Sequence, residues 1–230
     1  MDVKRASLIL GACLFALVVG GCGGDNDSGQ FITVSNKTVE ILSDPNLDGD
    51  ITLDLASNSL SAPSFAVNTG SVLAGVNLSP TGTPISETRG FLAFPLGALP
   101  SNASIQFASI SIFIDAVSFA TTSTAPIPFL LESMDTISFP VPIVSSDFDS
   151  PYRMSESVPF FGRDAGTFVN IDVTSLLVDA QARLLSQFEI RFVFDQATFQ
   201  SAPRTTRGLI EIDDQPANPS RAPLLRIEYF

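Results

Sequence analysis

The sequence predicts an all-β sandwich of antiparallel strands with one short helix. Short runs rich in Ile, Val, Phe, Thr and Ser recur along the chain, and Pro, Gly, Asn or Asp separates each run from the next. Apolar and polar residues alternate in several runs, most clearly in Phe188–Asp195 (FEIRFVFD). Alternation with period two and frequent turn residues are typical of antiparallel strands, and this pattern argues against a β-α-β fold.

The first 30 residues are predicted to be an export signal and a tether rather than part of the fold. Lys4 and Arg5 precede an apolar run over residues 6–19, and small residues then lead to Cys22. The run is shorter than the roughly 20 residues that a membrane-spanning helix needs. A basic start, a short apolar run and small residues describe a secretory signal. Because it ends in a cysteine, this one resembles the bacterial lipoprotein signal.

That resemblance implies a lipoprotein signal peptide over residues 1–21, a lipid-modified Cys22 and a flexible tether over residues 22–30. Cys22 would carry a thioether-linked diacylglycerol and an acylated amino group, and two or more acyl chains give stable membrane attachment. Gly23, rather than Asp, follows the cysteine, which implies an outer-membrane lipoprotein if the cell is Gram-negative. An ordinary signal peptide with an incidental cysteine is the alternative.

Composition restricts the chemistry of the exported part. Without residues 1–21 the chain keeps 23 acidic and 10 basic residues, and Cys22 is its one cysteine. Such an acidic chain repels phosphate backbones, so nucleic acid is not expected as a partner. A single cysteine excludes a disulfide within the chain. The absence of histidine removes Ser-His-Asp and Cys-His catalysis and the commonest zinc ligand.

A single domain is predicted over residues 31–230, with a strand for each apolar run. The predicted strands are 31–35, 38–43, 50–55, 71–78, 90–96, 104–118, 136–144, 167–173, 187–195, 207–213 and 223–229. At the centre of the fold we expect a β-hairpin over residues 89–118, with Leu99-Pro100 in its turn. The apolar residues of its long strand change parity near Ala108-Ser109, which predicts a bulge there.

One helix is predicted near residues 173–186, which would cover one end of the sandwich. Asp172 or Thr174 would cap it, and Leu177, Ala180 and Leu184 lie at helical spacing. Residues 119–165 are rich in Pro and Ser. We expect an irregular insertion there, made of edge strands or ordered loops.

Three separated segments resemble the DNRLRE-type, or carbohydrate-binding family 96-like, domains of secreted bacterial and archaeal proteins. They are RGFLAFPLGALPSNASIQFASISIFI (89–114), NIDVTSLLVDA (170–180) and SRAPLLRIEY (220–229). Asp48-Gly49 before Ile51 is similar to the family's opening strand. The resemblance covers roughly residues 40–230, except 119–165. It implies a jelly-roll, galactose-binding-like sandwich in a surface-attached protein. An aromatic residue of the family is missing near Ala180, so no role is carried over for it.

The segment DPNLDGDI (44–51) matches D-x-N-x-D-G-x-I, the first part of a calcium-binding loop. Asp44, Asn46, Asp48 and Asp50 would supply the oxygen ligands that calcium prefers. Position 12 of the loop is Leu55 rather than a bidentate carboxylate, and no helix pattern flanks it. Calcium is therefore one hypothesis for this loop. An acidic turn that opens the first strand of the sandwich is the other.

Catalysis is not expected from this sequence. A glycosidase needs only two carboxylates, and Glu132 with Asp135, or Asp147 with Asp149, offer such pairs. Proximity in the sequence, however, does not place two carboxylates across a cleft, and acidic residues are frequent in this chain.

A sugar-binding surface would have to use few aromatic residues. Such surfaces commonly present Trp or Tyr rings, and this chain has no Trp and two Tyr residues. Tyr229 belongs to the closing strand and is expected in the core. Tyr152, with Arg153 beside it, is therefore the candidate for a ligand contact at the surface.

Taken together, the sequence predicts a non-catalytic, lipid-anchored envelope or surface module that binds an extracellular polysaccharide or another envelope component. One alternative is a purely structural envelope lipoprotein with no small ligand. The other is an adhesion module stabilised by calcium, the one cofactor considered.

Overall fold

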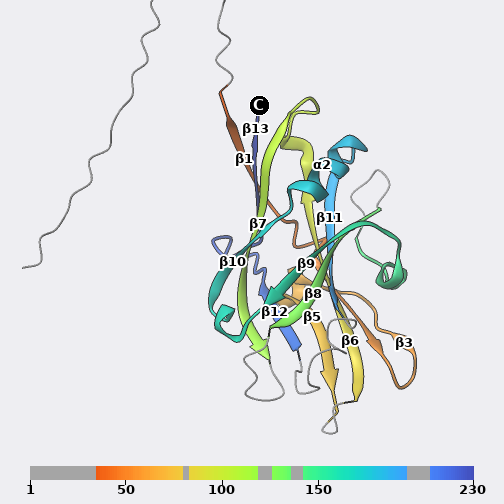
Figure 1. Cartoon of the computed structure of the whole chain (residues 1–230). Helices are drawn as coiled ribbons and strands as arrows, with labels where there is room; N and C mark the ends of the chain where they lie inside the picture. Colours follow the sequence, from red (N-terminus) through yellow and green to blue (C-terminus); the bar gives the residue numbers. More distant parts are fainter. Residues whose placement is uncertain (1–34, 80–82, 119–125, 136–141, 196–207) are drawn as a thin grey trace, which may run out of the picture. The chain divides into compact units, whose positions relative to one another are not determined.

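The computed structural model describes residues 35–79, 83–118, 126–135, 142–195 and 208–230, and its strands form one antiparallel sheet that curls on itself (Figure 1). One half of the sheet consists of β1 (Lys37–Leu42), β7 (Ile105–Ser118), β10 (Thr167–Asp172), β12 (Gly208–Asp213) and β13 (Leu224–Tyr229). The other half consists of β2 (Gly49–Asp54), β3 (Ser59–Leu60), β4 (Ser64–Phe65), β5 (Ser71–Leu78), β6 (Pro84–Pro95), β8 (Ile127–Met134), β9 (Tyr152–Phe160) and β11 (Gln187–Phe194).

The strand order makes the two halves continuous. Neighbouring strands follow the path β1-β13-β7-β12-β5-β6-β11-β8-β9, while β10 pairs with β7, β2 pairs with β6, and β3 and β4 pair with β2. The ladder between β12 and β5 joins the halves. The predicted all-β antiparallel sandwich is confirmed.

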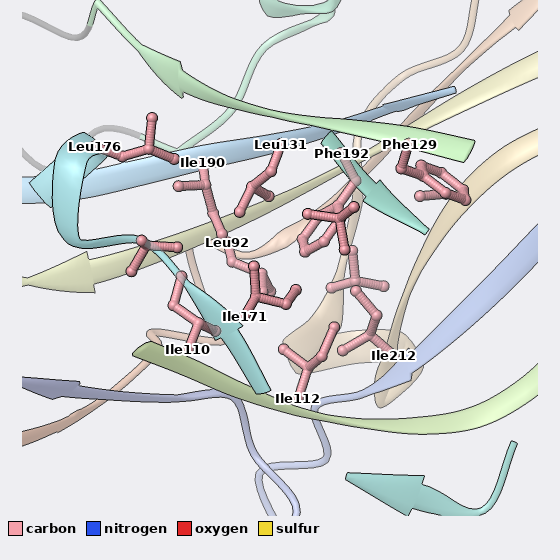
Figure 2. Packing of buried hydrophobic residues seen from close by; sticks show 14 of the residues in the cluster. Leu92, Ile110, Ile112, Phe129, Leu131, Ile171, Leu176, Ile190, Phe192 and Ile212 are labelled. Atoms are coloured by element: carbon pink, nitrogen blue, oxygen red, sulfur yellow. The ribbon is translucent and has the colours of Figure 1, made fainter. Parts of the chain in front are cut away.

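The core lies between the two halves and is made of large apolar side chains. Figure 2 shows Ile110, Ile112, Ile171 and Ile212 of one half opposite Leu92, Leu131, Ile190, Phe129 and Phe192 of the other. Alternate residues of each strand point into this core because successive side chains of a strand lie on opposite faces. Burying each such side chain contributes about 1.5–3 kcal/mol, so the core is the main source of stability.

The predicted hairpin over residues 89–118 is not formed. β6 pairs with β2, β5 and β11, whereas β7 pairs with β10, β12 and β13. Residues 96–104, which include the 3-10 helix η1 (Leu96–Ala98), therefore carry the chain from one half to the other. The hairpin prediction was wrong because a link of this length also spans the roughly 10 Å between packed sheets.

The predicted bulge exists but lies two residues earlier. Glu228 and Tyr229 pair with Phe107 and Ile105, so Gln106 is the extra residue, while Ala108 and Ser109 pair regularly. A second register shift, against β12, leaves Asp115 as an extra residue. The parity change in the sequence therefore does reflect a bulge. The position of the bulge is set by the pairing with β13.

Two α-helices occur in the described residues, α1 (Ala66–Thr69) and α2 (Thr174–Ala182). The predicted helix is α2, and it buries Leu176, Leu177 and Ala180 at one end of the core. Leu184 was wrongly placed on its buried face: it lies after the helix, with φ 57° and 78% of its surface exposed. No helix in this part of the chain is long and apolar enough to cross a membrane.

Asp172 stabilises the turn before α2. Its Oδ1 accepts hydrogen bonds from the Thr174 hydroxyl at 2.7 Å and from the Thr174 N–H at 2.9 Å. These two bonds lower the pKa of Asp172. The N-cap position itself falls on Val173, which has no side-chain cap.

Residues 119–165 contain two strands, β8 and β9. β9 is an edge strand, as expected for this segment, whereas the prediction of edge strands or loops was wrong for β8. β8 pairs with β11 on one side and with β9 on the other, so it belongs to the sheet. Its sequence, IPFLLESM, contains a proline and does not alternate simply. Of the strand predicted over 136–144, residues 142–144 are not a strand. Residues 136–141 lie outside the described residues, as do residues 31–34 of the first predicted strand.

Replacing Phe192 by Ala is expected to destabilise the protein by about 3–5 kcal/mol, because the fully buried ring would leave a cavity between the halves. The free energy of unfolding from urea titration checks this. Leu184→Ala is the control and should change it by no more than about 0.5 kcal/mol. A loss below about 1 kcal/mol for Phe192→Ala would contradict the packing described here.

Candidate functional site

The structure places the surface residues singled out in the sequence on an edge strand. Tyr152 begins β9 with 49% of its surface exposed, and Arg153 is the extra residue where the register between β8 and β9 shifts. Neither residue lines the hollow described below. Cys22 and the rest of residues 1–30 lie outside the described residues.

The acidic loop at residues 44–50 forms a turn in which the predicted calcium ligands bond to different groups. Asp44 Oδ1 accepts the Asn46 N–H at 3.0 Å and its side-chain amide at 2.9 Å. Asp48 Oδ1 accepts the Ala93 N–H at 2.6 Å, and Asp50 Oδ2 accepts the Leu73 N–H at 3.3 Å. Among the described residues no group of three His, Cys, Asp or Glu side chains converges as a metal cage. The structure does not bring the four together.

Asp48 instead faces Asp214, which directly follows β12. Burial, followed by the charge of Asp214, raises the pKa of Asp48 well above its usual value. Burial also raises the pKa of Asp214 to about 6, and the charges of Asp213 and Asp44 contribute. Sequence reasoning missed this pair because the ladder that places Asp214 beside the first loop is not visible in either segment alone.

Each carboxylate of the pairs considered for catalysis has a bonding partner of its own. Glu132 is buried against Arg191, with Oε2 2.9 Å from Nε. Asp135 pairs with Arg183, Asp149 pairs with Arg89, and Asp147 Oδ2 accepts the Val144 N–H. Each carboxylate therefore has a structural role in this part of the chain.

The outer face of β6, β8 and β11 is covered by residues 142–151, which we call the strap. The strap contains the 3-10 helix η2 (Ser145–Asp149), and the Phe148 ring is buried beneath the Arg89 guanidinium, 3.9 Å from its carbon. Arg89 donates to the Phe148 carbonyl. Arg191 donates to the carbonyls of Asp147 at 2.7 Å and Phe148 at 2.8 Å.

The strap buries the outer side of β11. Alternation in residues 188–195 predicts a half-buried strand, with one face in solvent. Phe188, Ile190, Phe192 and Phe194 do share the inner face, but the half-buried prediction is wrong, because all eight residues of the strand are buried. Under the strap a small second core forms from Ile51, Phe91, Met134, Ile143 and Phe148. This face of the sandwich is therefore closed.

Phe148→Ala is expected to release the strap, because it removes the ring on which Arg89 stacks and most of the apolar contact beneath it. Limited proteolysis with mass spectrometry should then show cleavage within residues 142–151 that is much faster than in the parent protein. Val144→Ala, which alters an exposed strap side chain, should leave cleavage unchanged. Equal cleavage of the two variants would show that Phe148 does not hold the strap.

The outer face of β1, β13, β7 and β10, which we call the β7 face, is arranged in rows set by strand register. Two rows run across all four strands: Leu42, Leu224, Ser111 and Asn170, and then Glu40, Arg226, Ser109 and Asp172. Beside the first row lie Phe113 and Phe168, in an edge-to-face pair with ring centroids 5.1 Å apart. The aromatic pair thus lies beside a row that is half apolar and half polar, and the second row is polar.

A hollow of about 350 Å³ opens on the β7 face. Its lining consists of Leu42, Ser111, Phe168, Pro219, Ser220, Ala222 and Leu224. Phe168 keeps 48% of its surface exposed. The loop that forms the rim is held by Arg221, which stacks on Phe113 at 4.1 Å and pairs with Asp213 at 3.4 Å. The volume is at the small end of the range for ligand sites, and apolar walls with a few polar groups are typical of them.

Sequence reasoning missed this hollow, although one signal was present. In β10, Phe168 shares its parity with Asn170 and Asp172 and not with Val169 and Ile171. An aromatic residue on the polar side of a strand indicates an exposed ring, which is a candidate for a ligand contact. The walls supplied by Leu42 and the loop 219–222 come from distant segments and could not be assigned.

No family model and no curated protein matches this chain. The resemblance to DNRLRE-type domains therefore stays a prediction. The structure itself shows an all-β antiparallel sandwich.

Proposed function

We propose that this protein is a non-catalytic, lipid-anchored envelope module that binds a neutral extracellular polysaccharide on its β7 face. The observation that carries the proposal is the hollow walled by Phe168, Leu42 and Leu224 over the hydroxyl of Ser111. The resemblance of residues 1–21 and Cys22 to a bacterial lipoprotein signal supports the anchored location.

The chemistry of the hollow suits a sugar ring. The CH face of a pyranose packs on an exposed aromatic ring, while its hydroxyls need hydrogen-bonding groups nearby. Phe168 supplies the ring, and Ser111, Ser220 and Asn170 supply hydroxyl and amide groups. Further polar side chains continue the rows beyond the hollow, so an extended chain would have more contacts than a single sugar.

Charge favours a neutral polymer over an acidic one. The protein has a formal net charge of –12, and the second row of the β7 face places Glu40 and Asp172 with Arg226. An anionic polysaccharide would meet more negative than positive groups there. The other outer face is covered by the strap, so a polymer is not expected to bind it.

Phe168→Ala is expected to weaken polysaccharide binding by about tenfold or more, which corresponds to about 1.4 kcal/mol. A glycan array of neutral and acidic polysaccharides identifies the polymer, and isothermal titration calorimetry measures its Kd. Tyr152→Ala is a matched control, because Tyr152 has nearly the same exposed fraction (49% against 48%) but lies outside the hollow. Its Kd should not change.

Two outcomes would contradict this proposal. No binding to any polysaccharide would favour a purely structural envelope lipoprotein. Binding that Tyr152→Ala abolishes and Phe168→Ala leaves intact would move the site to the edge of β9.

Cys22→Ala is expected to abolish incorporation of fatty acid into the protein, because it removes the thiol that would carry the diacylglycerol. Metabolic labelling of cells with an alkyne-tagged palmitate checks this, and Cys13→Ala is the matched control because residue 13 belongs to the predicted signal peptide. Labelling of Cys22→Ala equal to that of the parent protein would contradict the lipid anchor.

A further inference from the structure

Three buried, unpartnered oxygens belong to side chains that interact where the first loop lies against the end of β12. They are Oδ2 of Asp48, Oδ2 of Asp214 and Oγ of Ser43, from residues that are 0%, 1% and 7% exposed. The three side chains lie within reach of one another. None of these oxygens forms a hydrogen bond of good geometry with a described group. Buried polar atoms of this kind call for a ligand, a water or a proton.

The charge around the three oxygens is negative. Asp44 and Asp213 both act on Asp214. Arg221 pairs with Asp213 and Asp115 rather than with the buried carboxyls. One proton would neutralise one of these charges, whereas a divalent cation would neutralise two. Burying two facing carboxylates without either is strongly unfavourable.

We propose that Asp48, Asp214 and Ser43 form a buried calcium site. The donors are carboxylate and hydroxyl oxygens, which select hard cations over transition metals. Water and main-chain oxygens would supply the remaining ligands, as they do in many calcium sites. This site shares only Asp48 with the loop motif in the sequence, and it does not depend on polysaccharide binding.

The test measures the melting temperature of the full chain, purified in detergent and stripped with EGTA, while calcium is added. A cation that binds only the folded state stabilises it. Free calcium at about 100 times its Kd should therefore raise the melting temperature by about 5 °C or more. Titration calorimetry with calcium chloride gives the Kd, and magnesium is run in parallel. No shift and no heat at 10 mM calcium would overturn the proposal.

Variants distinguish this site from its alternatives. Asp214→Asn should abolish the calcium response, whereas Asn46→Ala and the exposed-acid control Glu40→Gln should retain it. If Asp214→Asn does not fold, Ser43→Ala replaces it and should weaken the calcium Kd about threefold to tenfold. A calcium response that survives in Asp214→Asn, or an unchanged Kd in Ser43→Ala, would overturn the site. The alternative is that Asp48 and Asp214 share a proton. In that case the parent protein would not respond to calcium, and Asp214→Asn would have the same raised melting temperature with and without calcium. That result would also overturn the proposed calcium site.

Discussion

The rest of the structure depends on the pairing of β7 along both of its edges and on its packing into the core. Its edges are bonded by β13 and β12 on one side and by β10 on the other, and its isoleucines fill the core on its inner side. Its outer face is therefore the one surface it can present. β11 occupies the corresponding place in the other half, bonded to β6 and β8, but the strap covers its outer face. Of the outer faces of β7 and β11, the β7 face is therefore the one open to a ligand.

Closing the sheet on itself requires a seam with little side-chain bulk. Along the ladder of β12 and β5, Leu209 pairs with Gly75 and Gly208 pairs with Val76. Gly75 has φ +136°, a value that side chains disfavour, and a Cβ there would collide with the Gly208 carbonyl. A Cβ on Gly208 would in turn meet the side chain of Ile127 across the core. Two glycines thus let the backbone of β5 and β12 approach closely where the halves join.

The sequence predicted the strands that alternate, and it failed where a strand is covered on both sides or paired at a distance. β5, β7 and β13 were found within a residue of their bounds, because period two survives when one face is solvated. β8 was missed because it is paired on both sides and its sequence does not alternate simply. β11 does alternate, but its polar side is buried as well, because Arg191 on that side bonds Glu132 and the strap. Pairing is a property of the whole sheet, which explains the error over β6 and β7. For the same reason, the contact between Asp48 and Asp214 could not be predicted from either segment alone.

The acidic group and the hollow are connected through one loop. Asp214 begins the loop that leads from β12 to β13, and its N–H donates to the Gly70 carbonyl at 3.0 Å. Near the other end, the Ser43 N–H donates to the Pro223 carbonyl at 3.0 Å. Between these points the loop supplies Pro219, Ser220 and Ala222 to the rim of the hollow. Residues of the proposed calcium site therefore hold both ends of the rim. A cation bound there would restrict the loop, and a preformed rim lowers the entropic cost of ordering it when a polymer binds.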